Sequence, residues 1–420
     1  MNNQSRDGTS DEIGASEAAR LLGVKLPTLY AYVSRGLLRS LPGRAGRARR
    51  YLRSDVEALR TRGPSVRAAA GALRWGEPIL ESSITEMTPA GPAYRGRLAT
   101  ELARGGASFE SVAELLWTGA LPAEPAAWEA APCPELEGVL PLLPVDAPHA
   151  AVFPVLVAAR AARDAGRFDT TPEGVLPRAR GLIRLLAAGL ALPRAPARAR
   201  RAAKAPRIAE VVARAFALDS SPATLSAVDA FLILLADHEL NASTFAARVA
   251  ASTHADVYAV VQAGLATLSG PLHGASSDRF EALLAEVGAP EHAERAVQER
   301  ARRGELVPGF GHPFYGAAGD ARARVLLELA WERKPAPEVA IANAVIGALE
   351  RAAKPPPNVD SAAVVLRAAL GMPRGAVAGL FAVGRSAGWI AHALEQVASG
   401  HLLRPRARYK GPTAAVAPGE

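Results

Sequence analysis

Three short stretches far apart in this chain each place one ionisable side chain beside glycines or in a turn. They are GPLHGAS with His273, VPGFGHPFY with His312 and PNVD with Asp360. A carboxylate and two imidazoles on separate elements are the groups needed to remove a proton from carbon and to add the resulting carbanion to a carbonyl. Taken together, the three residues indicate chemistry of this kind.

Each of the three also has a purely structural interpretation. His273 follows the expected end of a helix, where a histidine can cap the C-terminus. His312 lies in a glycine-dense turn, and Asp360 directly precedes a helical stretch, where aspartate is a common N-cap. For each residue taken singly, the sequence leaves both alternatives open.

The sequence lacks the motifs that would indicate several other kinds of chemistry. The three histidines His238 (in ADHELNAST), His273 and His312 are separated by 35 and 39 residues, and none has a partner four positions on. Because zinc ligands are usually closely spaced, we expect no zinc site. The chain also lacks a GxSxG elbow, a GxxxxGK[ST] loop and a GxGxxG after a strand.

The elements that hold these residues are expected to be helices. Hydrophobic residues make up 49% of the 420 residues and aromatic residues only 5%, and alanine and leucine favour helix. Helices are predicted at 242–252 and 257–268, and two helical patterns lie within 94–122. No strand-like alternation of any length follows residue 110.

Six stretches occur in one order over about 180 residues: DHELNASTFAARVAAST, LATLSGPLHG, VPGFGHPFY, PNVD, GRSAGWIAHALEQ and LLRPRARYKG. This order resembles the citrate synthase family, from about residue 75 to residue 411, roughly 80% of the chain. The resemblance implies a mainly α fold with a citrate synthase-like all-helical body made of large and small helical domains. It also implies a homodimer that needs no metal or redox cofactor, with CoA serving as substrate and product.

The resemblance also assigns roles to residues. It implies that Asp360 takes a methyl proton from acetyl-CoA, that His273 donates a hydrogen bond to the thioester oxygen, and that His312 polarises the ketone of oxaloacetate. The residues expected to hold the acceptor carboxylates are His238, Arg322, Arg385 and Arg404, the last across a dimer interface. The backbone expected to hold CoA is that of Val307, Pro308, Gly309, Phe310 and Gly311. The implied activity is condensation of acetyl-CoA with oxaloacetate to citrate and CoA, with a 2-methylcitrate synthase as the alternative.

Two positions depart from the family pattern. Arg322 lies ten positions after His312, rather than the usual nine, and the usual DPR is replaced by DAR. This spacing makes Arg322 the least secure of the expected substrate ligands. Ser361 stands where a phenylalanine usually follows NVD, a change that can alter the pocket wall without removing the carboxylate.

The N-terminal part of the chain has a different character. Residues 1–65 hold 12 Lys/Arg against 6 Asp/Glu, so most of the net charge of +8 lies there. The stretches ASEAARLLGV, LPTLYAYVSRGLL and RxxRYLRSDVEAL resemble a winged helix-turn-helix of the MerR/excisionase type. Such a module can bind DNA phosphates and bases. The residues expected at a DNA surface are Thr28, Tyr30, Tyr32, Arg44, Arg47, Arg49 and Arg50.

Two alternatives remain for this module at the sequence level. It can be a small interaction domain with a solvated charged face, or it can make the chain a DNA-binding regulator whose synthase-like body senses a metabolite. The expected boundaries are 1–62 for the winged helix-turn-helix, 63–73 for a linker and 74–420 for the catalytic domain.

The sequence also favours a cytoplasmic protein without a membrane segment. A single cysteine, Cys133, excludes an intramolecular disulfide framework and fits a reducing compartment. The N-terminus is polar and acidic, unlike a signal peptide, and no run of 18 apolar residues occurs.

Overall fold

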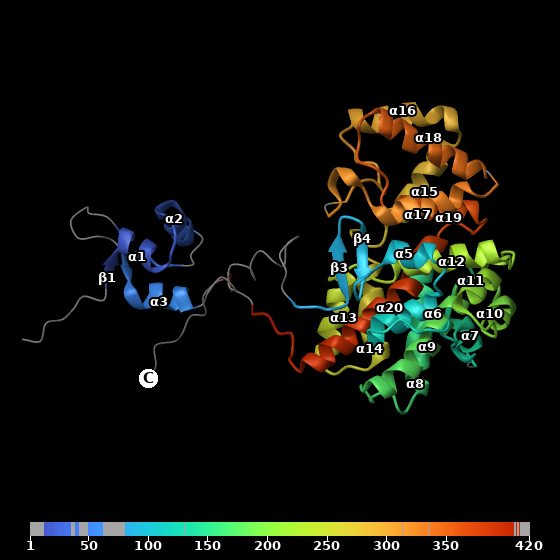
Figure 1. Cartoon of the computed structure of the whole chain (residues 1–420), viewed down its shortest axis with the longest axis horizontal. Coiled ribbons are helices and arrows are strands. Elements are labelled where there is room, and N and C mark those ends of the chain that lie inside the picture. The colour runs from blue at the N-terminus through green and yellow to red at the C-terminus, as the bar shows by residue number, and fades with distance from the viewer. Residues whose placement is uncertain are drawn as a thin grey trace, which may run out of the picture. The chain divides into compact units, whose positions relative to one another are not determined.

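The computed structural model describes residues 12–34, 38–41, 49–61, 80–130, 132–312, 314–334, 336–406, 409 and 411. The chain divides into two compact units, residues 1–81 and 82–420 (Figure 1), and each is described by itself. The expected linker, 63–73, lies outside the described residues.

The first unit contains two short strands and three helices. They are β1 (Glu12–Gly14), α1 (Ala15–Leu21), α2 (Leu26–Ser34), β2 (Arg50–Leu52) and α3 (Arg53–Thr61). Strand β1 pairs antiparallel with β2, with Ile13 opposite Tyr51, and Gly23 makes the turn between α1 and α2 with a φ of +65°. A small core that includes Leu29 and Val56 joins the helices to this sheet.

The second unit opens with a small antiparallel sheet of strands in the order β3 (Thr85–Thr88), β4 (Gly91–Tyr94) and β5 (Arg97–Leu98). The expected all-helical body did not include this sheet. These strands are too short for an alternating pattern to be visible in the sequence. The Tyr94 hydroxyl lies 2.9 Å from the Ile233 carbonyl oxygen, to which it donates, and so fastens the sheet to the helices behind it.

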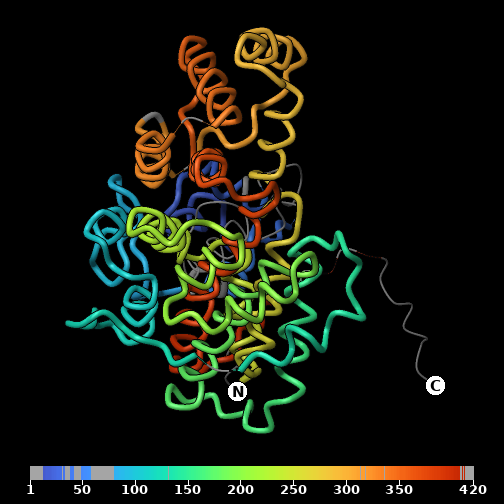
Figure 2. The backbone as a smooth tube through the Cα atoms, turned by 90° about the vertical axis from the view of Figure 1, so that its right-hand side faces the viewer, coloured from blue at the N-terminus to red at the C-terminus, as the bar shows by residue number. Residues whose placement is uncertain are grey.

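Helices form the rest of the second unit in two groups, so the expected mainly helical fold is confirmed. The large helical part comprises α5 (Ala99–Arg104), α6 (Phe109–Thr118), α7 (Glu135–Gly138), α8 (His149–Arg163), α9 (Pro172–Gly189), α10 (Pro196–Ala202), α11 (Ile208–Phe216), α12 (Pro222–Leu235), α13 (Ala242–Ser252), α14 (Val257–Leu268) and α20 (Ala376–Ser399). The small helical part comprises α15 (Ser276–Val287), α16 (Ala293–Arg302), α17 (Ala321–Trp331), α18 (Pro337–Arg351) and α19 (Val359–Ala369). Figures 1 and 2 show the small helical part, in yellow to orange-red, at one end of this unit. The helices predicted at 242–252 and 257–268 are confirmed at these positions.

Helix α20 is the central helix of the large helical part, where it packs against α12, α13 and α14. Among the described residues it is long and apolar enough to cross a membrane, but 83% of its most apolar window is buried against the rest of the unit. Such burial is typical of a core helix. Gly384 and Gly388 allow α20 to approach the end of α12, because a Cβ at either position would lie under 3.0 Å from backbone atoms there.

Candidate active site

His238 and His312 lie together although 74 residues separate them in the sequence. His238 follows the end of α12 and is 7% exposed, and His312 lies on the loop that precedes α17. Their ring centroids are 5.3 Å apart, and the His238 Nε2 atom is 2.6 Å from the Tyr315 hydroxyl oxygen. The large and small helical parts therefore meet at this pair.

Arg322 joins the same cluster despite the unusual spacing from His312. It is 2% exposed, and its Cζ atom lies 5.8 Å from the centroid of the Tyr315 ring. Its Nε and Nη2 atoms donate to the two carboxylate oxygens of Asp320, at 3.0 and 2.8 Å. Asp320 was not predicted from the sequence, and its only signal is its position as the N-cap of α17.

The Asp360 carboxylate is not used to cap a helix. The N-cap of α19 is Asn358, whose Oδ1 atom accepts the N–H of Asp360 at 2.9 Å, so the capping interpretation of Asp360 is wrong. Burial raises the pKa of Asp360 to about 6, against the opposing effect of the nearby Arg322 guanidinium. Ser276, three residues after His273, also acts to lower this pKa, which places Asp360 beside the turn that carries His273.

His273 does not cap α14 either. Its Nε2 atom lies 2.9 Å from the hydroxyl oxygen of Ser243, which also accepts the indole N–H of Trp389 at 3.2 Å. Burial, with a contribution from the charge of Arg385, lowers the pKa of His273 to about 4. The ring is therefore neutral across the physiological pH range.

Arg385 projects from α20 and is 2% exposed. Its Nε atom donates to the Leu235 carbonyl oxygen at 2.8 Å. Burial first, and then the charges of Arg322 and Arg385, lower the pKa of His238 well below its ordinary value. Burial and the Arg322 charge likewise lower the pKa of His312.

Arg404 is separate from this cluster. It lies in the exposed stretch that follows α20, and it makes no hydrogen bond or ion pair with the residues that the structure describes. The other residues expected to act in catalysis or to bind the acceptor, from both helical parts, lie within electrostatic reach of Arg322 or Arg385.

The loop 307–311 is joined to the start of α19 by main-chain and side-chain hydrogen bonds. The Gly309 carbonyl oxygen accepts the N–H of Asn358 at 2.9 Å and the hydroxyl of Ser361 at 2.6 Å. The N–H of Gly311 donates to the Pro356 carbonyl oxygen at 2.8 Å. Because His312 follows this loop directly and Asp360 lies within the joined stretch, the same set of hydrogen bonds positions the two residues relative to one another.

Gly309 is expected to be intolerant of substitution. Its φ is +83°, and a Cβ there would lie 2.8 Å from the Ser361 Cβ atom. Gly96 is a matched control, with a φ of +81° and nothing within 4 Å of its Cβ position. We expect Gly96→Ala to lower the free energy of unfolding by about 1–2 kcal/mol, from the backbone alone, and Gly309→Ala to lower it by more. If denaturant titrations give the two variants equal losses in the free energy of unfolding, the Ser361 side chain moves aside without an energetic cost.

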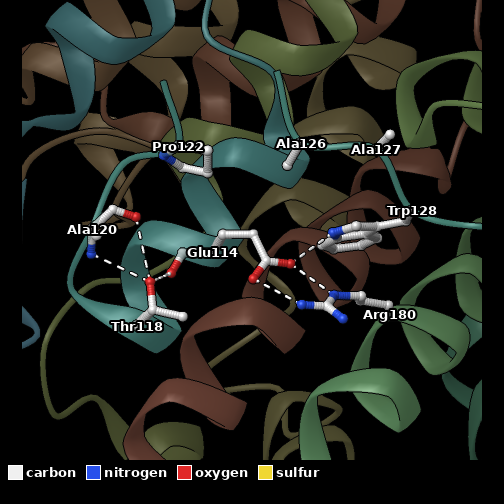
Figure 3. Close-up of a pocket in the computed structure, with 8 residues that line it drawn as sticks. All are labelled: Glu114, Thr118, Ala120, Pro122, Ala126, Ala127, Trp128 and Arg180. Carbon is white, nitrogen blue, oxygen red and sulfur yellow. Dashed lines mark hydrogen bonds and ion pairs between the residues drawn. The ribbon is translucent and has the colours of Figure 1, made fainter. Parts of the chain in front are cut away.

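A hollow of about 430 Å³ lies elsewhere, between α6, the loop that follows it and α9 (Figure 3). Its polar groups are paired with one another. The Glu114 carboxylate accepts from Arg180 at 2.8 and 3.1 Å and from the Trp128 indole N–H at 2.9 Å. None of the predicted site residues line this hollow. We interpret it as a structural clamp rather than as a reaction site.

The described residues contain no group of three or more His, Cys, Asp or Glu side chains that could hold a metal ion.

The residues expected at a DNA surface are only partly on the surface. Tyr30 is 51% exposed, Arg49 is exposed, and Thr28 and Arg50 are partly buried. The expectation for Tyr32 is wrong, because its side chain is 3% exposed within the core of the first unit. Tyr32 lies three positions after Leu29 and so shares its buried helix face. Arg44 and Arg47 lie outside the described residues.

Comparisons with known proteins agree with this architecture. Residues 72–406 match the family model described as citrate synthase, C-terminal domain, and residues 14–64 match a helix-turn-helix domain. Citrate synthase 2 of Bacillus subtilis is 40% identical over 201 residues, 46% of this chain and 53% of that protein. The chain therefore spans about half the length of the curated relatives it matches.

Solved structures cover more of the chain. Citrate synthase from Thermotoga maritima superposes with a TM-score of 0.69 at 28% identity, over 81% of this chain and 96% of that one. The same coverage and TM-score, at 26% identity, hold for the citrate synthase of Thermoplasma acidophilum in ternary complex with carboxymethyl coenzyme A and oxaloacetate. Both the family model and the fold extend over most of the second unit, and the chain belongs to the citrate synthase family.

Proposed function

We propose that the second unit condenses acetyl-CoA with oxaloacetate and then hydrolyses the thioester, giving citrate and CoA. The observation that carries the proposal is the environment of Asp360. A carboxylate with a pKa of about 6 lies within the electrostatic reach of two buried arginines, Arg322 and Arg385. This carboxylate is a stronger base than an ordinary one and is still ionised at neutral pH.

His273 is assigned to the enolate oxygen that forms when Asp360 removes the methyl proton. A neutral imidazole suits this role, because it can donate a hydrogen bond without giving up its proton. The Ser243 hydroxyl accepts the Trp389 N–H and has one hydrogen for two acceptors, the Asn241 Oδ1 atom at 2.8 Å and the His273 Nε2 atom at 2.9 Å. The proposed role requires that this hydrogen be given to Nε2, which places the ring hydrogen on Nδ1, where it can stabilise the developing charge.

His312 is assigned to the ketone of the acceptor, and His238, Arg322 and Arg385 to its carboxylates. A dicarboxylate needs fixed cations, and arginine binds carboxylates with two parallel hydrogen bonds. The Nε and Nη2 atoms of Arg322 donate to Asp320, so Nη1 is the guanidinium nitrogen that is not bonded to this carboxylate. Holding enolate and ketone together supplies a further part of the rate enhancement.

The assay that tests this function measures release of CoA from acetyl-CoA in the presence of oxaloacetate. A panel of other 2-oxo acids, and propionyl-CoA in place of acetyl-CoA, separates a citrate synthase from a 2-methylcitrate synthase. The proposal predicts the highest kcat/KM for acetyl-CoA with oxaloacetate. Absence of CoA release with every pair would overturn the proposed reaction.

The reaction should lose activity in acid because of Asp360. Only the ionised carboxylate acts as a base, so kcat/KM is expected to fall about tenfold per pH unit below about pH 6. His273, with a pKa of about 4, stays neutral through this range and does not contribute to the fall. A pH–rate profile checks this, with circular dichroism at each pH as the control for unfolding. A fall that begins only near pH 4, the usual value for aspartate, would show that burial does not raise this pKa.

A homodimer is proposed as the functional form, with Arg404 completing the partner's site. The supporting observation is the exposed stretch after α20, in which Leu402 and Tyr409 are 55% and 75% exposed. Light scattering measures the assembly, and Arg404→Ala should raise the KM for oxaloacetate without changing the mass. A monomer with full activity would contradict this proposal.

Double-stranded DNA is a second proposed ligand, for the first unit. The supporting observation is the exposed position of Lys25, Tyr30 and Arg49 in a unit with a helix-turn-helix. Mobility-shift titrations at about 50 and 200 mM salt test the idea, since affinity falls about 10³–10⁵-fold when 6–10 phosphates are contacted. No salt-sensitive binding to any DNA would leave the module as an interaction domain.

A further inference from the structure

The turn that carries His238 has an unusual backbone. Glu239 follows His238 with a φ of +53°, which is uncommon for a residue other than glycine. The Asp237 Oδ2 atom accepts the N–H of Glu239 at 3.0 Å and so holds this conformation. Because strained backbone persists only when its surroundings enforce it, Asp237 is the first candidate for that enforcement.

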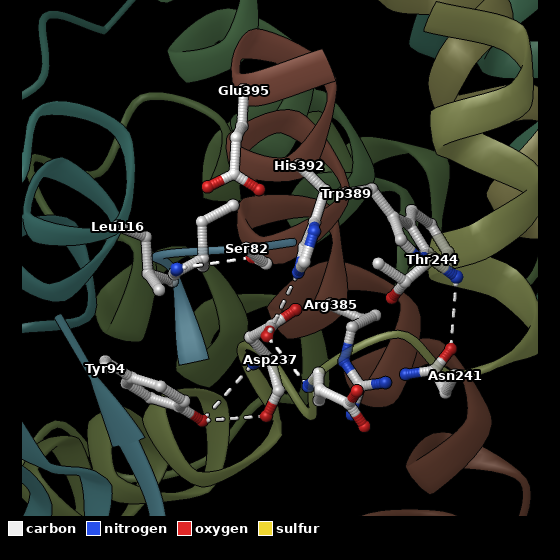
Figure 4. Close-up of polar contacts among 12 residues, drawn as sticks. Ser82, Tyr94, Leu116, Asp237, Asn241, Thr244, Arg385, Trp389, His392 and Glu395 are labelled. Atoms are coloured by element: carbon white, nitrogen blue, oxygen red, sulfur yellow. Dashed lines mark hydrogen bonds and ion pairs between the residues drawn. The ribbon is translucent and has the colours of Figure 1, made fainter. Parts of the chain in front are cut away.

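Asp237 is in turn enclosed by α20 and β4 (Figure 4). Its side chain is 0% exposed, and a Cβ at Gly388 would lie 2.3 Å from its Oδ1 atom. The N–H of Gly388 donates to the Ala236 carbonyl oxygen at 3.1 Å, and the N–H of Asp237 contacts the Tyr94 hydroxyl at 3.2 Å. The turn therefore has contacts on both sides and little room to move.

His392, one turn further along α20, supplies a ring nitrogen to this carboxylate. It is 0% exposed, with Nε2 3.4 Å from Asp237 Oδ2 and Nδ1 3.3 Å from the Nη1 atom of Arg248. A guanidinium only donates, so Nδ1 accepts and the ring hydrogen lies on Nε2, pointing at Asp237. Although burial alone would raise it, the neighbouring His392 and Arg385 hold the pKa of Asp237 below its ordinary value.

Arg248 fixes the ring from the far side because it is itself anchored. It is 2% exposed, and it donates to Gln396 at 2.9 Å and to Glu395 at 2.7 Å. Glu395 accepts the N–H and the hydroxyl of Ser83 at 2.8 and 2.9 Å. A continuous set of hydrogen bonds thus runs from the start of the second unit to the turn that carries His238.

We propose that Asp237 and His392 are positioning residues for His238, with His392 in the Nε2–H form orienting the carboxylate that holds the strained turn. The inference rests on the proposed function, in which His238 binds the acceptor. Asp237 also lies near Arg385, so both effects fall on the acceptor side of the site. The loop 307–311 and Asp360 belong to the small helical part, so the backbone expected to hold CoA and the base should be unaffected.

Calorimetric titration of the full chain with oxaloacetate, without acyl-CoA, tests this proposal. His392→Phe keeps the ring volume but removes both nitrogens, and it should weaken oxaloacetate binding about tenfold or more. His392→Gln can still donate to Asp237 and accept from Arg248, and it should recover most of the affinity. The KM for acetyl-CoA should stay within about twofold of the wild-type value in both.

His149→Phe is the matched control. His149 is partly buried and hydrogen-bonded through its ring, at 3.1 Å to the Leu190 carbonyl oxygen, but it lies at the start of α8. The His149→Phe substitution should leave the affinity for oxaloacetate unchanged. Wild-type affinity in a folded His392→Phe, or an equal loss in His149→Phe, would overturn the positioning role.

Failure of the proposed function gives a different result. A wild-type protein that neither binds oxaloacetate nor releases CoA would overturn the proposed reaction. The positioning role would then be tested without a ligand, by nitrogen-15 spectra of histidine-labelled protein. The same spectra test it if His392→Phe does not fold. They should show His392 in the Nε2–H form, and His392→Gln should leave the His238 signals in place. A His392 ring with its hydrogen on Nδ1 would overturn the proposal.

Discussion

Asp360→Asn is expected to lower kcat for CoA release by about 10²–10⁴-fold, the usual contribution of a positioned acid or base. Asparagine keeps the shape of the side chain and the start of α19, because the helix is capped by Asn358 rather than by residue 360. The loss should therefore be chemical rather than structural. Oxaloacetate affinity should change little, since the acceptor lies on His238 and the two arginines in the proposed arrangement. Steady-state CoA release and calorimetric titration measure the two quantities.

Asp278→Asn provides the matched control for that experiment. Asp278 is an exposed carboxylate in the first turn of α15, two residues after Ser276. Removing its charge changes the electrostatics of the same helical part without touching the cluster, and kcat should remain within about twofold. Undiminished turnover in Asp360→Asn would remove the assigned base, and an equal loss in both variants would point to general electrostatics.

The sequence identifies much of the site because its residues lie in ordered local motifs. His273, His312 and Asp360 each stand in a recognisable stretch, and the order of those stretches indicates the family. The choice between capping and chemistry needed the structure. In the run PNVD, either Asn358 or Asp360 can cap the following helix, and only the extended backbone at Asn358, with φ −102° and ψ −177°, decides.

The supporting residues were not predictable from the sequence for a physical reason. Asp237 and His392 are 155 residues apart, and Asp320 reaches the N–H of Val359 39 residues away. No local pattern of hydrophobicity or spacing reports such contacts, because burial and distance in the folded chain create them. The error at Tyr32 has another cause, because its spacing of three from Leu29 places it on the buried face of the helix, and helix periodicity alone indicates a buried residue there.

Asp320→Ala should be the most destabilising of the charge-removing substitutions considered for the second unit. The side chains of Asp320 and Arg322 are 0% and 2% exposed, and breaking a buried pair typically lowers the free energy of unfolding by about 3–5 kcal/mol. The carboxylate also accepts the N–H groups of Arg322 and Val359, at 3.0 and 3.1 Å, so the substitution should weaken the starts of α17 and α19 together.

Denaturant titration followed by tryptophan fluorescence measures the loss of stability in Asp320→Ala, since Trp117, Trp128 and Trp389 are buried in this unit. Glu328→Ala is the control, because its pair with Arg104 is 43% and 49% exposed and should contribute less than about 1 kcal/mol. Asp320→Asn with Arg322→Met removes both charges and should recover part of the stability lost in Asp320→Ala. If the single substitution costs no more than the control, Arg322 finds solvent or another partner, and the pair does not hold the two helices together.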